Sequence, residues 1–443
     1  MSTRTALYND QLATPFKPFS IRRLTLYSSI GLLLLVFLSK VSLKWSGLIP
    51  RTLPPIFFQY GMHPFINFGL NFIIFIGLLI VWNRSTSRTT AGATYSTYLY
   101  LLLGTLIVQT FFQISLVNVS YSASMQLAGV GMAFVLITLY SVILPSLLSV
   151  ETMVCCLKWI TLGAVILSLL LLPVAGMELF RGGRFIGIFK HIPHMVSTST
   201  FAFILLLPDI FAPQDHFTIW RKIFNIFALL LATLAVILTS TKAAFVTIIV
   251  AFLAAIIVFS SKRKSIRLFK VAFLTLVMLG VILFGVQTAR FLYEITTGQR
   301  SFGMRSAQNG IETRLDEVYR GIRSFNQSPY FGKGLMYKFM GGQDKGIKVT
   351  GYNSFKDPHN LFVSAGVIGG WPLFILSIIG YLLMIFGTLR GLNDTSPAVK
   401  VCAIFLLSHL PVFIIYHAHF SLGGIGDRIY WLIFGYLGRG KLS

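Results

Sequence analysis

Residues 243–259 read AAFVTIIVAFLAAIIVF, a run without a single charged side chain. A helix of this length crosses most of a hydrocarbon core about 30 Å thick. Similar runs recur along almost the whole chain, in which 55% of the 443 residues are hydrophobic and only 11% are charged. About a quarter of the residues would be charged in an ordinary soluble domain, so a soluble multidomain enzyme is excluded. The sequence predicts an all-α polytopic membrane protein.

About twelve transmembrane helices are expected from the apolar runs. The runs cover residues 24–42, 65–82, 95–117, 125–148, 154–175, 195–211, 223–241, 243–259, 268–286, 359–388, 398–417 and 420–437. The chain then divides into nine helices within 1–286, a long hydrophilic segment at 287–358, and three helices within 359–443. Within the hydrophilic segment, residues 312–325 place apolar side chains at helical spacing. We expect an amphipathic helix there, lying on the membrane surface.

The distribution of positive charge predicts the orientation of the chain in the membrane. Lys and Arg number 37 against 13 Asp and Glu. They concentrate in alternate short connections, as is typical of cytoplasmic loops, so the excess needs no nucleic-acid partner. This pattern places both termini in the cytoplasm and residues 287–358 on the outer side, which is the periplasm for a bacterial inner membrane. Cys155, Cys156 and Cys402 fall inside or at the edge of apolar runs and predict neither disulfides nor a zinc site.

Motifs for other membrane enzymes and pumps are absent from the sequence. It has no P-loop, no GxSxG elbow, no HExxH helix and no paired carboxylates in the spans, so ATP-driven transport and metalloprotease chemistry have no support. Instead, cations and imidazoles gather where the expected spans meet the outer surface. One short glycine-rich loop alone carries Arg181, Arg184, Lys190, His191 and His194.

Further candidates lie elsewhere on the same predicted side. Lys242 stands between two spans, Arg314 and Arg320 stand on the expected amphipathic helix, and His359 with Asn360 begins a span. Each residue taken alone also fits an interfacial anchor or a structural histidine. Together, arginine and lysine bind diphosphates, and an imidazole accepts a proton at neutral pH. The set predicts a metal-independent and cofactor-independent transfer from a diphosphate-linked donor at the outer face, where such donors are polyprenyl-diphosphate glycans.

Four stretches, in this order, resemble the bacterial O-antigen ligase and O-antigen polymerase superfamily of membrane glycosyltransferases. GRFIGIFKHIPHM (183–195) is similar to the family's RxxG-type outer loop, and TSTKAAF (239–245) to its Ser-Arg-Gly/Ala step, with lysine where arginine is usual. TRLDEVYRGIRSFNQSPYFGKG (313–334) is similar to the arginine-containing stretch that ends in PxxGxG. PHNLFVSAGVIGG (358–370) resembles the His-Asn segment followed by GxxG.

The resemblance implies a GT-C-like fold and a role for each matched residue. Arg184 and Arg314 would bind the diphosphate of an undecaprenyl-diphosphate glycan, helped by Lys242 and Lys190, and His359 would be catalytic in an inverting transfer. The supporting residues would be Asn360, Arg181 and Arg320.

The acceptor distinguishes the two activities of this superfamily. A ligase transfers the glycan to lipid A-core, and a polymerase transfers it to another lipid-linked repeat unit. The hydrophilic segment carries eleven Lys and Arg against six Asp and Glu, which favours a phosphorylated lipid A-core and hence a ligase. A protein O-glycosyltransferase, a transporter of lipid-linked glycans and a structural scaffold remain alternatives.

Overall fold

The computed structural model describes residues 21–42, 64–84, 92–116, 123–181, 183–189, 191–211, 219–259, 307–335, 360–415 and 424–439. These residues are mostly helical. Among them, eight helical stretches are long and apolar enough to cross a membrane. The predicted fold class, an all-α polytopic membrane protein, is therefore confirmed.

The described elements follow one another along the chain in this order. The first half forms α1 (Ile21–Leu38), α2 (Pro64–Arg84), α3 (Ala93–Leu116), α4 (Ala123–Thr138), the π-helix η2 (Leu139–Ile143), α5 (Leu144–Leu147), α6 (Val150–Leu170), α7 (Leu172–Ala175), the 3-10 helix η3 (Gly176–Leu179), and the strands β1 (Phe180–Arg181) and β2 (Arg184–Phe185). The second half forms α8 (Ile192–Phe211), α9 (Ile219–Leu238), α10 (Lys242–Phe259), α12 (Ala307–Gln327), α13 (Leu361–Leu392), α14 (Pro397–Ile415) and α15 (Ile425–Leu437). Eleven of the twelve expected apolar runs coincide with these helices, and the run 268–286 lies outside the described residues.

Two helices form the interior of the bundle. α8 packs against α6, α9, α10 and α14, and its residues 198–208 are buried without interruption. α15 packs against α13 and α14 and is buried throughout 427–437. Both helices are buried over most of their length, as expected for helices that contact other helices instead of water.

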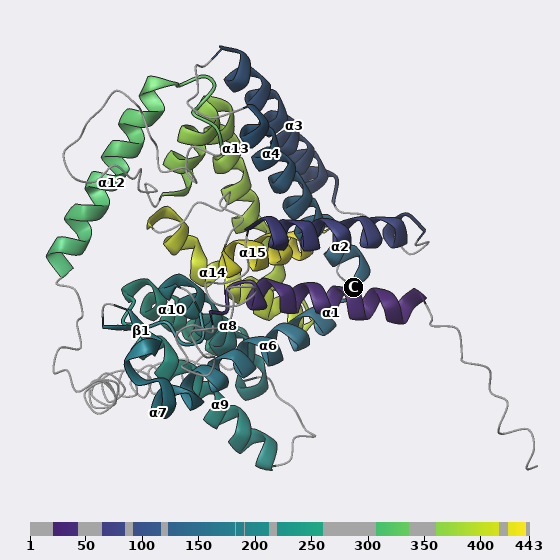
Figure 1. The fold of residues 1–443 in the computed structure, drawn as a ribbon. Coiled ribbons are helices and arrows are strands. Elements are labelled where there is room, and N and C mark those ends of the chain that lie inside the picture. The colour runs from purple at the N-terminus through teal and green to yellow at the C-terminus, as the bar shows by residue number, and fades with distance from the viewer. Residues whose placement is uncertain are drawn as a thin grey trace, which may run out of the picture.

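The two ends of the bundle carry different parts of the chain. Figure 1 shows α1 beginning on the same side as the C-terminus, and α12 with β1 on the opposite side. At the end that carries the C-terminus, Arg439 is buried and donates hydrogen bonds to the Val142 carbonyl (2.8 Å) and the Pro145 carbonyl (2.5 Å). Arg390 in turn donates to the Leu437 carbonyl (2.5 Å). These cations, expected to be loop charges that set the orientation, also close the ends of neighbouring helices.

α13 is two helical arms folded into a hairpin. The backbone leaves the helical conformation at Gly369 and Gly370, where Gly370 has φ +66° and ψ −160°. Ring centroids of Phe362 lie 6.5 Å from Phe374 and 5.5 Å from Tyr381. A straight helix would separate Phe362 and Tyr381 by about 28 Å, because each residue rises about 1.5 Å. The first arm, 361–368, therefore runs antiparallel to the second, 371–392.

This hairpin corrects the expected single span at 359–388. Eight residues make a helix about 12 Å long, which is too short to cross the bilayer, whereas the 22 residues from 371 onward reach about 33 Å. The second arm is thus the spanning helix, with Trp371 at its start. The first arm re-enters the bundle, and the helix begins immediately after the expected catalytic position, His359, which itself lies outside the described residues.

Substituting Gly370 tests the hairpin turn. Gly370→Ala should lower the thermal unfolding midpoint of the detergent-purified protein, because only glycine adopts this backbone conformation without strain of about 1–3 kcal/mol. The added Cβ would also lie 2.5 Å from the Pro329 and Tyr330 carbonyl oxygens. Gly163→Ala in α6 is the matched control, since no described atom lies within 4 Å of its Cβ. Equal midpoints for the two variants would contradict the described turn.

Candidate functional site

A small β-hairpin positions the first two candidate cations. β1 and β2 pair antiparallel with Phe180 opposite Phe185 and Arg181 opposite Arg184. Phe185 is fully buried and anchors the hairpin in the bundle. Arg184 is half-buried, and its Nη2 donates a long hydrogen bond of 3.4 Å to the Ser240 carbonyl. Arg181 is exposed and its Nη1 lies 3.0 Å from His191 Nδ1.

The step between α9 and α10 supplies the third cation. Ser240 has φ +50°, a positive value that is rare outside glycine, so the chain reverses within three residues. The Ser240 N–H donates to the Ile237 carbonyl (2.9 Å), and the Ala244 N–H donates to the Thr241 carbonyl (3.0 Å). Lys242 is the first residue of α10 and is exposed. The Ser240 carbonyl that Arg184 contacts thus lies two residues before Lys242.

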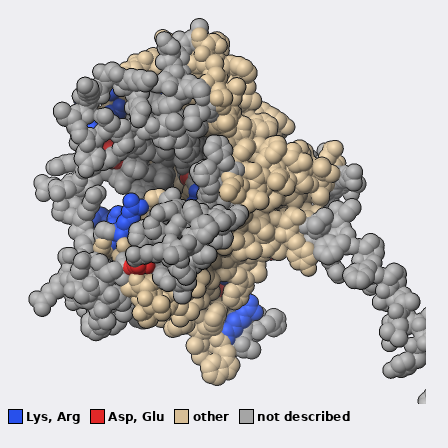
Figure 2. Space-filling view, viewed as in Figure 1, with Lys and Arg blue, Asp and Glu red and all other residues tan. Residues whose placement is uncertain are grey.

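Arg184 and Lys242, far apart in the sequence, therefore meet at one end of the bundle. Figure 2 shows a patch of Lys and Arg side chains on the face that carries β1 and α10 in Figure 1, with a patch of Asp and Glu side chains beside it. We name Arg181, Arg184 and Lys242 the basic step. Concentrated positive charge at a helix N-terminus suits an anionic ligand, because the backbone N–H groups there add to the attraction.

The remaining predicted residues are distributed as follows. Arg320 is exposed on α12, and Asn360 precedes α13, where its Oδ1 accepts a hydrogen bond from the Val363 N–H (3.0 Å). Arg314 belongs to α12, but its side chain is not described. Lys190 and His359 lie outside the described residues. The structure thus brings Arg181, Arg184 and Lys242 together and leaves the other pairings untested.

A cavity adjoins the basic step on the inner side. It lies between α8, α10, α14 and α15 and holds about 590 Å³ of empty space, counting the part open to the surroundings. Most of its wall is apolar. Its lining includes Thr241, which immediately precedes α10, together with Thr247 on α10, Phe201, His409, Phe413 and Tyr430. Tyr430 also lines a smaller cavity together with Leu361, the first residue of α13. Tyr430 therefore stands between the basic step and the arm that follows His359.

His409 was missed in the sequence analysis. Its ring stacks on Phe405 with centroids 4.3 Å apart, and its Nδ1 lies 2.9 Å from the Phe405 carbonyl. The contact with the backbone four residues earlier is local, which is common for a polar side chain inside a membrane helix. The available signal was an imidazole in the middle of an apolar run, a position at which ionisable residues are costly and usually functional.

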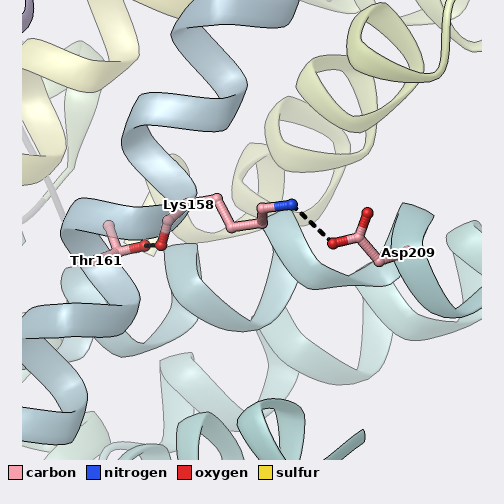
Figure 3. A network of polar contacts seen from close by, with 3 residues as sticks. All are labelled: Lys158, Thr161 and Asp209. Carbon is pink, nitrogen blue, oxygen red and sulfur yellow. Dashed lines mark hydrogen bonds and ion pairs between the residues drawn. The ribbon is translucent and has the colours of Figure 1, made fainter. Parts of the chain in front are cut away.

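An ion pair inside the bundle was also missed. Figure 3 shows Lys158 on α6 reaching Asp209 on α8, with Nζ and Oδ2 2.8 Å apart. The two side chains are only 15% and 12% exposed. Single charges in two separate apolar runs give no sequence signal that they are partners. Within the described residues, no three His, Cys, Asp or Glu side chains are placed to share a metal.

The comparisons with known proteins add one match. Residues 227–378 match the family model described as O-antigen ligase. The matched stretch begins within α9, includes the step at Ser240 and Lys242, and ends in the second arm of α13. No curated protein matches the chain.

The Lys158–Asp209 pair is open to a direct stability test. Lys158→Met should lower the thermal unfolding midpoint by the equivalent of about 3–5 kcal/mol, because it leaves a buried carboxylate without its partner. The double variant Lys158→Met with Asp209→Leu should recover most of that loss. Single and double variants that unfold at the same temperature would show that the pair contributes nothing.

Proposed function

We propose that this protein, whose residues 227–378 match the family model described as O-antigen ligase, is a ligase. It transfers a glycan from undecaprenyl diphosphate to lipid A-core in the outer leaflet of the bacterial inner membrane. The observation that supports this proposal best is the convergence of Arg184 and Lys242 on one reversal of the chain. The match to this family model supports a glycan substrate carried by a lipid, and the basic step supplies groups that suit its diphosphate.

The diphosphate is the leaving group of the reaction. Its negative charge increases as the bond to the anomeric carbon breaks, so cations fixed beside it stabilise the transition state more than the ground state. In our proposal Arg184 binds the diphosphate through its planar guanidinium, and Lys242 adds a point charge. Arg314 on α12 and Lys190 complete the set, with Arg181 and Arg320 in support.

His359 acts as the general base. The acceptor hydroxyl oxygen attacks the anomeric carbon from the face opposite the diphosphate, the new glycosidic bond forms, and the bond to the diphosphate oxygen breaks. The hydroxyl proton passes to the imidazole of His359, and undecaprenyl diphosphate leaves. Asn360 fixes the start of the arm that follows His359, because its side chain caps the helix at the Val363 N–H.

The cavity beside the basic step accommodates the start of the polyprenyl chain. Phe201, Phe413 and Tyr430 give it an aromatic wall, and Thr241 connects it to the basic step. A lipid whose phosphates lie at Lys242 would place its first isoprene units here, and the rest of the chain would pass into the bilayer. Burial of these apolar units raises the affinity for the donor without any charged contact.

The orientation of the chain follows from the same proposal. Undecaprenyl-diphosphate glycans are used at the periplasmic face, so the end that carries α12, β1 and the basic step faces the periplasm. α1 begins, and the chain ends, on the opposite side of the bundle in Figure 1. Both termini are therefore cytoplasmic in this proposal.

An assay with purified protein tests the activity. Wild type in detergent with EDTA is given a defined undecaprenyl-diphosphate glycan and lipid A-core, and glycosylated lipid A-core is measured. His359→Ala should lower the rate at least about 100-fold, since a positioned base contributes about 10²–10⁴-fold. Arg314→Ala should lower it about 100-fold through loss of transition-state charge stabilisation. Arg323→Ala, an exposed arginine on the same helix, is the control and should stay within about twofold.

Other outcomes assign other activities. Longer lipid-linked chains, with lipid A-core left unmodified, would make the protein a polymerase with the same site. No glycosidic product with any acceptor would contradict a transferase and favour transport. Loss of activity on addition of EDTA would contradict metal independence.

A bulky substitution tests the cavity. Thr247→Phe should raise the KM for the undecaprenyl donor at least about tenfold, the equivalent of about 1.4 kcal/mol, because the ring fills space that the chain needs. Val246→Phe is the matched control, since Val246 is 47% exposed on the outside of α10. A donor with a shorter prenyl chain that keeps the first isoprene units should discriminate between the two variants equally well, because only those units occupy the cavity. Equal KM values for the undecaprenyl donor would place the chain elsewhere.

A further inference from the structure

The loop that follows α12 binds to the turn of the α13 hairpin through its backbone. The Lys333 N–H donates to the Val367 carbonyl (2.7 Å), and the Gly334 N–H donates to the Ile368 carbonyl (2.9 Å). In the other direction, the Trp371 N–H donates to the Pro329 carbonyl (2.7 Å). A helix that breaks leaves its last carbonyls and the next N–H groups without partners, and the loop supplies them.

Gln113 on α3 holds both segments. Its Nε2 donates to the Phe331 carbonyl in the loop (2.5 Å) and to the Ile368 carbonyl in the hairpin (2.8 Å). The side chain is 1% exposed. A single amide nitrogen has two hydrogens, so it can satisfy one carbonyl from each segment at once. Its two bonds therefore fix the distance between the loop and the hairpin turn.

Gln126 on α4 provides a comparison within the same region. It is fully buried and lies close to the Cα of Gly334, since a Cβ there would be 2.5 Å from its Nε2. Neither its Nε2 nor its Oε1 has a hydrogen-bond partner among the described residues. The two glutamines thus share residue type, burial and neighbourhood, and only Gln113 bridges the two segments.

We infer that Gln113 is a positioning residue for the transfer reaction, because its amide holds the loop after α12 against the turn of the α13 hairpin. α12 carries Arg314, and the first arm of α13 begins at Leu361, two residues after His359. Gln113 touches neither substrate nor reacting atoms in this role. It sets the position of the helix that brings the donor-binding arginine relative to the arm that follows the base. The reaction itself is the one proposed above, so this inference rests on that proposal.

Hydrogen exchange tests the bridge without any substrate. In detergent-purified protein, Gln113→Met should speed amide exchange about tenfold in peptides covering 328–335 and 366–372, because the Phe331 carbonyl loses its donor. Gln126→Met is the control and should leave exchange in both peptides unchanged within about twofold. Unchanged exchange in Gln113→Met would overturn the inference. Should Gln113→Met not fold, Gln113→Asn keeps both hydrogens but is one methylene too short to reach both carbonyls, and it should speed exchange as well.

Kinetics test whether the bridge positions the site. In wild type, Gln113→Met should lower kcat/KM for the donor about tenfold. In an Arg314→Ala background the same change should cost less than about twofold, since the residue that it positions is already gone. A general loss of stability would instead multiply with Arg314→Ala and give about tenfold in both backgrounds. That result would overturn the positioning role even if exchange is faster.

The two experiments separate this inference from the proposed function. If wild type forms no glycosidic product, the proposed function fails, and the positioning role fails with it. The exchange result then decides only whether Gln113 bridges the loop and the hairpin. If wild type is active and Gln113→Met matches Gln126→Met in both measurements, the inference alone fails.

Discussion

The structure depends on the need to pair every backbone polar group inside a membrane protein. The break of α13 at Gly369 and Gly370 leaves carbonyls and N–H groups unpaired at a buried position, where the packed protein excludes water. The loop after α12 and the side chain of Gln113 supply those partners. Because the partners come from α3 and from the hydrophilic segment, pairing the break also attaches that segment to the bundle. The pairing of the backbone groups at this break thereby holds the end of α12 beside the α13 hairpin.

The same requirement gives the cations of this protein two different roles. Arg439 is buried and donates to one carbonyl of the π-helix, that of Val142, and to one of the α5 turn that follows it, that of Pro145. Lys242 is exposed at a helix start, where the backbone offers donors and no acceptors. A cation at a helix start satisfies no unpaired backbone group of the helix. Its charge instead adds to the partial positive charge of the N–H groups there. Arginine at a C-terminal end is thus a structural cap, and the basic step is the better place for an anion.

Sequence patterns predicted the helices well and their interruptions poorly. Long apolar runs and the amphipathic spacing in 312–325 reflect burial, which sequence records directly. The run at 359–388 was wrong as a single span, because Gly-Gly-Trp-Pro inside an apolar stretch does not say whether a helix kinks or reverses. Arg184 and Lys242 were predicted one by one, but their proximity depends on a turn at Ser240 that serine rarely forms. His409 could have been found as an imidazole in the middle of an apolar run. No feature of the sequence indicates that Lys158 pairs with Asp209.

The motifs that resemble the O-antigen ligase and polymerase superfamily owe part of their pattern to packing. The PxxGxG stretch and the GxxG stretch contact each other in the structure, since a Cβ on Gly332 would meet the Ile368 carbonyl and the Gly369 nitrogen at 2.4 Å. Their glycines allow the two backbones to approach each other closely. Arg184 lies outside the matched residues 227–378. Its place in the site therefore follows from one contact, the hydrogen bond to the Ser240 carbonyl, which joins it to the matched region.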